Sequence, residues 1–117
     1  MQTGERERSP LTQMRRGLVE YCVLALLRDR ERYAVELVDV LTKHGLIASE
    51  GTIYPLLSRL RKQGLVDTTW RESELGPPRR YYGLSADGIA TGDRFASDWM
   101  SLSESVNKII RGEVDVA

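Results

Sequence analysis

The sequence is poor in the residues that build catalytic and metal centres. Its 117 residues include a single histidine, His44, and a single cysteine, Cys22. One histidine and one cysteine cannot complete the four-ligand set of a zinc site, and a lone thiol cannot form an internal disulfide. His44 lies near the end of an expected helix, where a favourable contact with the helix dipole accounts for it, and no glycine-rich phosphate loop is present. We therefore expect no catalytic residue, no metal and no cofactor.

Long apolar runs and an excess of charge of one sign are also absent. The longest apolar run, Cys22 to Leu27, is far shorter than the roughly 20 residues that cross a bilayer. The first ten residues, MQTGERERSP, are too charged for a signal sequence and have no apolar periodicity. We expect a soluble, cytoplasmic protein without a membrane contact, in which residues 1–10 form a mobile tail.

The positive charge is clustered although the total charge is balanced. Lys and Arg number 17, as do Asp and Glu, so the formal net charge is zero and does not distinguish nucleic acid from other partners. The basic residues nevertheless form three islands, Arg15-Arg16, Arg59 to Lys62 and Arg79-Arg80. If these islands converge in space, they create a local cationic surface.

The segment from Ser49 to Gly64, SEGTIYPLLSRLRKQG, has the periodicity of an amphipathic helix. One face carries the apolar side chains Ile53, Leu56, Leu57 and Leu60. The opposite face carries hydroxyls and cations, and no carboxylate occurs from Gly51 through Gly64. Solvated helices usually interleave both signs of charge, so this pattern favours an anionic partner. A polar face that simply meets water is the alternative.

Local signals predict where this helix begins and ends. Ser49 is the expected N-cap residue, because its hydroxyl can accept a hydrogen bond from the first turn. Gly64 is expected just beyond the C-terminus. Pro55 lacks an N–H group, which places the start of the regular helix near Thr52.

Two further helices are expected before this segment, and two strands after it. Residues 11–28 are apolar nearly all round and predict a central, buried helix, and residues 33–43 predict a second helix. Residues 65–72 and 79–84 read as strands, joined by SELGPP, which we expect to continue neither strand and to leave Arg79-Arg80 at the hairpin tip. A helix-turn-helix followed by a basic hairpin is typical of a winged helix.

The last helix, expected from Ser85 to about Arg111, carries an apolar stripe that is too long for one small domain. The stripe repeats with spacings of 3, 4, 3, 4 and 3 through Gly92, Phe95, Trp99, Leu102, Val106 and Ile109, with Ala96 and Ile110 beside it. A helix of about 26 residues is about 39 Å long. We expect a homodimer to cover the excess stripe; folding back onto its own domain is the alternative.

These elements predict a mainly α fold with a small β-hairpin (α+β). The expected organisation is a tail over residues 1–10, a winged helix-turn-helix DNA-binding domain over residues 11–84, and a C-terminal dimerisation helix over residues 85–117.

Four sequence motifs resemble those of short PadR-family transcriptional regulators. They are YCVLALL in the first helix, GTIYPLLSRLRKQGLV, GPPRRYYGLS, and a C-terminal amphipathic helix bearing a tryptophan; together they cover about residues 14–111. Where the family usually has Gly-Tyr in the second helix, this chain has Ala34-Val35. The resemblance implies a dimeric repressor that binds double-stranded DNA at an inverted repeat and is released by a small, aromatic or planar effector.

The resemblance and the charge pattern together define three sets of candidate residues. The expected DNA contacts are Arg15, Arg16, Ser49, Thr52, Tyr54, Ser58, Arg59, Lys62, Arg79 and Arg80. The expected dimer interface contains Leu18, Cys22, Gly92, Phe95, Ala96, Trp99, Leu102, Val106, Ile109 and Ile110. The expected effector contacts are Trp99, Leu18 and Leu102, with an interface tryptophan that only packs as the alternative for Trp99. A winged-helix protein-interaction adaptor is the main rival function.

Overall fold

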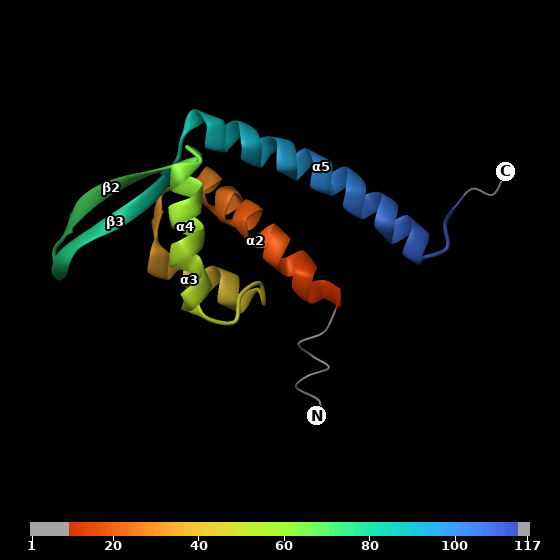
Figure 1. Ribbon diagram of the computed structural model, residues 1–117, viewed down its shortest axis with the longest axis horizontal. Coiled ribbons are helices and arrows are strands. Elements are labelled where there is room, and N and C mark those ends of the chain that lie inside the picture. Colours follow the sequence, from red (N-terminus) through yellow and green to blue (C-terminus); the bar gives the residue numbers. More distant parts are fainter. Residues whose placement is uncertain (1–9, 115–117) are drawn as a thin grey trace, which may run out of the picture.

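The computed structural model describes residues 10–114 and shows four α-helices, a 3₁₀ turn and three strands there (Figure 1). The predicted tail, apart from Pro10, lies outside these residues. The elements in chain order are α2 (Pro10–Asp29), β1 (Arg32–Tyr33), α3 (Ala34–Lys43), η1 (Glu50–Thr52), α4 (Ile53–Lys62), β2 (Val66–Ser73), β3 (Gly76–Leu84) and α5 (Ala86–Ile110). The predicted α+β class is confirmed.

The core lies between α2, α3 and α4 and is closed by the base of the sheet. Its largest fully buried side chains are Val23 and Leu24 from α2, Leu37 and Leu41 from α3, Ile53, Leu57 and Leu60 from α4, and Val66 from β2. The apolar face predicted for α4 is therefore buried, and its polar face is free. Burying side chains of this size contributes about 1.5–3 kcal/mol each, which fixes α4 firmly on the other two helices.

The sheet has three strands where the sequence predicted two. The additional strand, β1, pairs antiparallel with β3 through Arg32 opposite Tyr82 and Tyr33 opposite Tyr81. The second helix accordingly begins at Ala34 instead of Tyr33. A strand of two residues is too short to show an alternating pattern, so the sequence offered no signal for it.

The predictions that SELGPP interrupts the strands and that Arg79-Arg80 forms the hairpin tip are wrong. Strand β3 begins at Gly76 and includes Pro77 and Pro78, while Arg79 and Arg80 pair with Arg71 and Trp70 in the body of the hairpin. The prolines are tolerated because this end of β3 lies beyond β1 and beside an irregularity in its pairing with β2. Glu74 and Leu75 form the turn.

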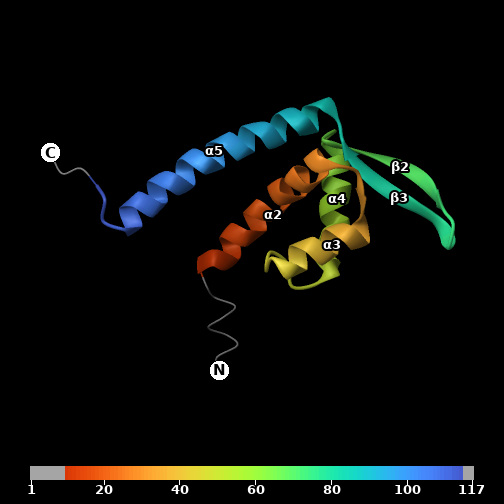
Figure 2. The same cartoon turned by 180° about the vertical axis from the view of Figure 1, so that it is seen from behind.

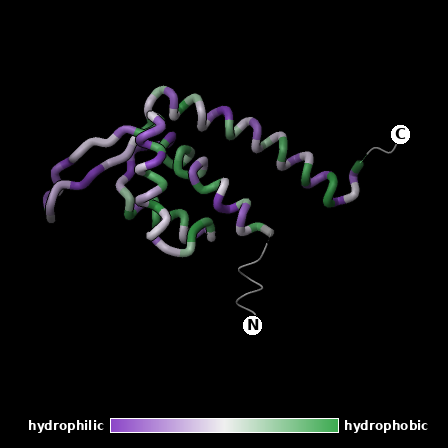
Figure 3. Tube along the Cα trace, in the orientation of Figure 1, coloured by the Kyte–Doolittle hydropathy of each residue, from purple (hydrophilic) through white to green (hydrophobic). Residues whose placement is uncertain are grey.

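Helix α5 begins against α2 and then extends away from the rest of the protein (Figures 1 and 2). Ser85 is its N-cap, as predicted, and accepts a hydrogen bond from the backbone N–H of Gly88. Apolar segments recur along α5 to its far end, where none of the other helices and strands of residues 10–114 lies beside it (Figure 3). Within residues 10–114, no helix is long and apolar enough to span a bilayer.

Candidate nucleic-acid interface

The start of α4 is built differently from the predicted N-cap. The 3₁₀ turn η1 separates Ser49 from the α-helix, and Ser49 makes no side-chain capping hydrogen bond, so this prediction is wrong. Thr52 precedes the α-helix, as the position of Pro55 predicted, and its hydroxyl donates to the Ser49 carbonyl at 3.4 Å. Pro55 is the third residue of α4, where its missing N–H would have no partner in the helix anyway.

The free face of α4 presents donors and no acids. Tyr54, Ser58, Arg59 and Lys62 are all exposed, and Tyr54 keeps 52% of its surface accessible. Arg61, which belongs to the same basic island but was not among the expected DNA contacts, is exposed as well. Gly64 follows the helix with a positive φ of 77°, as expected of the residue that ends it. The exposed face of α4 is therefore a short, rigid surface of cations and hydroxyls.

Among the described residues, Arg59 is the only residue on this face of α4 that contacts an acidic side chain. Its guanidinium lies 3.9 Å from the carboxylate of Glu20 on α2, and the Arg59 side chain is 54% exposed. An ion pair of this length between solvated groups contributes little, in the range of about 0–1 kcal/mol. Arg59 can therefore exchange Glu20 for another anion.

Two of the three basic islands come together around one hollow. Arg15 and Arg16 of α2 and Arg59 of α4 line a cavity of about 670 Å³, together with Thr52 and the loop before η1. We call this cavity the α2–α4 pocket. Arg15 and Arg16 have no ion-pair partner among residues 10–114. Their charges are available to a ligand or to DNA.

The third basic island lies on the wing, the β2–β3 hairpin, on the other side of α4 from the N-terminal part of α2 (Figures 1 and 2). The guanidinium of Arg79 lies over the Tyr33 ring at 4.6 Å, and that of Arg80 lies 5.9 Å from the rings of both Trp70 and Tyr82. Neither arginine has a carboxylate partner within residues 10–114. Aromatic stacking thus holds both cations without cancelling their charge.

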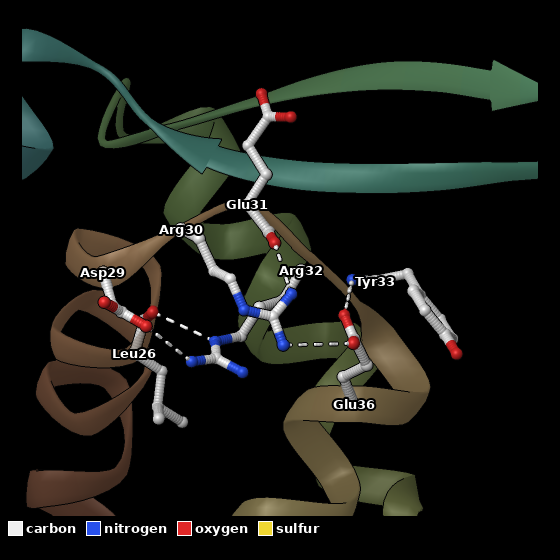
Figure 4. Close-up of polar contacts among 7 residues, drawn as sticks. All are labelled: Leu26, Asp29, Arg30, Glu31, Arg32, Tyr33 and Glu36. Atoms are coloured by element: carbon white, nitrogen blue, oxygen red, sulfur yellow. Dashed lines mark hydrogen bonds and ion pairs between the residues drawn. The ribbon is translucent and has the colours of Figure 1, made fainter.

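A third arginine on the wing is neutralised. Arg71 lies over the Tyr81 ring at 4.7 Å and pairs with the carboxylate of Glu31. Figure 4 shows why Glu31 is available: its side chain points toward the hairpin, whereas its neighbours Arg30 and Arg32 are engaged with Glu36 and Asp29. The wing therefore presents Arg79 and Arg80 as its free cations. Trp70, 65% exposed, joins them; the sequence could not place it, because only the strand register puts it opposite Arg80.

The residues expected at the dimer interface divide into two groups. In the first half of α5, Phe95 and Gly92 pack on α2 of the same chain: Phe95 stacks on Tyr21 at 4.4 Å, and Gly92 lies against Leu24. Trp99 stacks on Phe95 at 6.2 Å. Those in the second half are exposed, namely Leu102 (59%), Val106 (45%), Ile109 (64%) and Ile110 (75%). Folding back on its own domain thus accounts for only half of the stripe.

Leu18 and Cys22 lie half-buried on α2, on the helix that Phe95 contacts. Burial raises the pKa of the Cys22 thiol, which keeps it protonated and apolar. Ala96, another expected interface residue, is exposed on α5. Among the described residues, no three His, Cys, Asp or Glu side chains are grouped to hold a metal ion.

The comparison with known families decides the identity of this winged helix. Residues 23–93, from the middle of α2 into α5, match the transcriptional regulator PadR-like family. The chain belongs to this family. Members of the PadR family are DNA-binding transcriptional regulators and not enzymes, which confirms the functional class predicted from the sequence.

Individual PadR proteins are similar to the chain over most of its length. A crystal structure of a PadR-like transcriptional regulator from Bacillus cereus is 39% identical, covers 84% of this chain and 96% of its own, and superimposes with a TM-score of 0.78. A PadR family transcriptional regulator from Eggerthella lenta is 31% identical over 94% of this chain and 96% of its own, with a TM-score of 0.76. Transcriptional regulator Rv3488 of Mycobacterium tuberculosis is 29% identical over 92% of this chain and 96% of its own length.

Proposed function

We propose that this PadR-family protein is a homodimeric repressor that binds an inverted-repeat operator and is released by a small aromatic or planar effector. The observation that carries the proposal is the free face of α4, which has exposed hydroxyls and cations and no carboxylate. The buried apolar face of α4 holds the helix rigidly, so α4 can enter a major groove without reorganisation.

The cations and hydroxyls suit two kinds of DNA contact. Arg15, Arg16, Lys62 and Arg79 of the wing have the charge and exposure for phosphate contacts, which supply most of the affinity, and the half-buried Arg80 adds its charge beside them. Ser58 and Arg59 on the exposed face of α4, with Thr52 just before it, would read base edges, and an arginine can bind guanine through two hydrogen bonds. Tyr54 and Ser49 flank this set.

The dimer is supported by the exposed half of α5. Four large apolar side chains at the end of a helix leave a stripe that water solvates poorly, and a second copy related by a two-fold axis covers it symmetrically. Two recognition helices held in this way would bind half-sites about one helical turn, roughly 34 Å, apart. The operator is then expected to be palindromic.

The effector is expected between the two subunits near Trp99. This ring already continues an aromatic stack through Phe95 to Tyr21, and Leu18 and Leu102 lie on the same two helices. A planar ligand that stacks on Trp99 would alter the packing of the α5 helices and hence the spacing of the two wings.

Substitutions on α4 test the DNA contacts, using fragments selected from genomic DNA with the purified protein. Arg59→Ala should weaken binding by about 1–3 kcal/mol and relax base preference, whereas Lys62→Ala should weaken binding to all sequences and reduce the salt slope by about 1. Lys108→Ala, which removes a cation from α5, is the matched control and should leave the affinity unchanged.

The salt dependence of binding separates this function from that of a protein-interaction adaptor. A dimer that neutralises many phosphates must lose affinity steeply as salt is added, and an adaptor must not. Full affinity and full discrimination in Arg59→Ala would contradict the role given to this residue.

A further inference from the structure

Two arginines lie side by side on one face of the wing and differ in their acidic contacts. Arg71 of β2 and Arg79 of β3 are paired in register, so their side chains leave the sheet on the same face. Each exposed guanidinium lies over an aromatic ring, Arg71 over Tyr81 at 4.7 Å and Arg79 over Tyr33 at 4.6 Å. Arg71 has a carboxylate partner, Glu31, whereas Arg79 has none within residues 10–114.

The Glu31 side chain reaches Arg71 across the middle strand of the sheet. Glu31 lies between α2 and β1, and the strand order β1-β3-β2 puts β3 between it and Arg71. Figure 4 shows the Glu31 side chain directed toward the hairpin. It passes β3 at Gly83, where an added Cβ would lie only 3.1 Å from the Glu31 Cγ atom. The missing side chain at Gly83 therefore leaves room for this contact.

We propose that Glu31 is a positioning residue that keeps Arg71 from contacting DNA and thereby limits the affinity of the protein for DNA of any sequence. This inference rests on the proposed function, because it needs the wing to lie against the DNA backbone. If Arg79 meets a phosphate there, Arg71 lies only about 5 Å away at its Cα atom. Because Glu31 neutralises Arg71, each chain offers one free cation from this face instead of two.

A purely structural role for Glu31 predicts the opposite result. Like charges directly opposite each other in a sheet are unfavourable, so Glu31 also offsets the repulsion between Arg71 and Arg79. If this were its whole effect, removing the carboxylate would loosen the wing and weaken DNA binding. The ion pair itself adds little to stability, since the Arg71 and Glu31 side chains are 53% and 38% exposed. The direction in which the affinity changes therefore distinguishes the two roles.

The test measures the DNA affinity of the full-length Glu31→Gln protein by fluorescence anisotropy. One DNA fragment is selected from genomic DNA with the wild-type protein, and the other has the same length and composition in scrambled order. Glu31→Gln should bind both fragments at least about threefold more tightly at low salt, and the salt slope should steepen by about one per chain, because each chain neutralises one more phosphate. Unchanged or weaker binding would overturn the proposal. A gain confined to the selected fragment would do so as well, because phosphate contacts do not read sequence.

Two further variants show whether the gain acts through Arg71. Glu31→Gln combined with Arg71→Gln should return the affinity and the salt slope to wild-type values, because the freed cation is gone. Asp29→Asn is the matched control: it removes the same charge from the partner of Arg32, whose side chain is 13% exposed and donates to the Leu26 carbonyl at 3.1 Å. Arg32 cannot reach DNA, so Asp29→Asn should leave binding unchanged. A gain that survives in the double variant, or an equal gain in Asp29→Asn, would overturn the proposal; circular dichroism verifies that each variant is folded.

The Arg79→Ala variant separates failure of this inference from failure of the proposed function. It should weaken binding to both fragments and reduce the salt slope by about one per chain. If it does so while Glu31→Gln shows no gain, the role of Glu31 is refuted and the proposed function stands. If Arg79→Ala binds as the wild type does, the wing contact and the role of Glu31 are both refuted, and the α4 contacts stand. A wild-type protein that binds neither fragment would refute the proposed function together with this inference.

Discussion

Gly88 occupies a place where the chain has no room for a side chain. A Cβ atom there would lie 2.0 Å from the backbone carbonyl oxygen of Leu65, in the segment that joins α4 to the wing. Gly92, one turn further along the same helix, would place its Cβ 3.5 Å from the Leu24 side chain, which is an ordinary contact. Two glycines in one helix therefore serve different purposes.

Replacing each glycine with alanine should change stability in opposite directions. Gly88→Ala should destabilise the protein by about 1–3 kcal/mol, because the backbone must shift to relieve the clash. Gly92→Ala should be neutral or stabilising by up to about 1 kcal/mol, because alanine is the better helix former and the space exists. Urea denaturation followed by circular dichroism measures both values. Equal stability of the two variants would contradict the close approach.

The sequence predicted the chemical type of most site residues and missed their pairings. Exposed cations and hydroxyls on α4 followed from its periodicity, because helical spacing alone sets which side chains share a face. The weak pair of Arg59 with Glu20 and the compensation of Arg71 by Glu31 did not, because these partners are 39 and 40 residues apart in the chain. Only the folded backbone brings them within reach.

At the scale of secondary-structure elements, hydrogen bonds of Ser85 connect the start of α5 to the segment that follows α4. The hydroxyl of Ser85 donates to the Gly64 carbonyl at 2.6 Å and accepts from the Gly88 N–H at 3.0 Å, while the Ser85 backbone N–H donates to the Leu65 carbonyl at 3.1 Å. One serine thus caps α5 and also binds the residue that follows α4. The start of α5 cannot move without moving the end of α4.

Removing this hydroxyl should be costly for a surface residue. Ser85→Ala should lower the free energy of unfolding by about 1–2 kcal/mol, because both the cap and the bond to Gly64 are lost. Ser101→Ala, at an exposed position in the interior of the same helix, is the control and should have little effect. Thermal denaturation of the two variants under identical conditions checks this difference.

The helices were more predictable than the sheet. Periodicity located α3 and α5 to within one or two residues, and Pro55 and Gly64 located the two ends of α4, because these signals are local. The extent of β3 was missed because a proline is excluded only from a strand paired on both sides, and the sequence does not show where β1 stops. The loop residues Leu46, Ile47 and Ala48 attracted no attention, because a pocket depends on what three separate elements enclose.

At the scale of the whole molecule, the chain is extended, because half of α5 projects away from the winged-helix domain. The chain measures 62 × 41 × 23 Å, and the free half of α5 accounts for much of the longest dimension (Figure 1). The sequence predicted that the apolar stripe of α5 would extend beyond its own domain, and the exposed side chains of its second half agree with this. The second copy expected to cover the stripe stays a prediction. The sequence could not show that Phe95 and Trp99 pack partly within one chain, since the same spacing serves either contact.

A charge on the exposed stripe should separate the two copies. Val106→Glu should convert the dimer to a monomer at micromolar concentration and reduce operator affinity at least about tenfold, because a buried carboxylate without a partner is strongly unfavourable. Ser97→Glu is the matched control: it adds the same charge nine residues away, which is the opposite side of the helix at 100° per residue. Sedimentation velocity measures both variants. A dimeric Val106→Glu protein would contradict the interface.

Because the start of α5 is held at Ser85 and Gly88, a small rotation there becomes a large displacement at the other end of the helix. A helix of 25 residues is about 37 Å long, so a tilt of about 5° around its fixed end corresponds to roughly 3 Å at its tip. In the proposed dimer the same geometry works in the opposite direction: a small sliding of the two α5 tips past each other would rotate each α4 helix by several degrees. A ligand bound far from the duplex would then misalign both α4 helices at once, without unfolding any segment between α4 and α5.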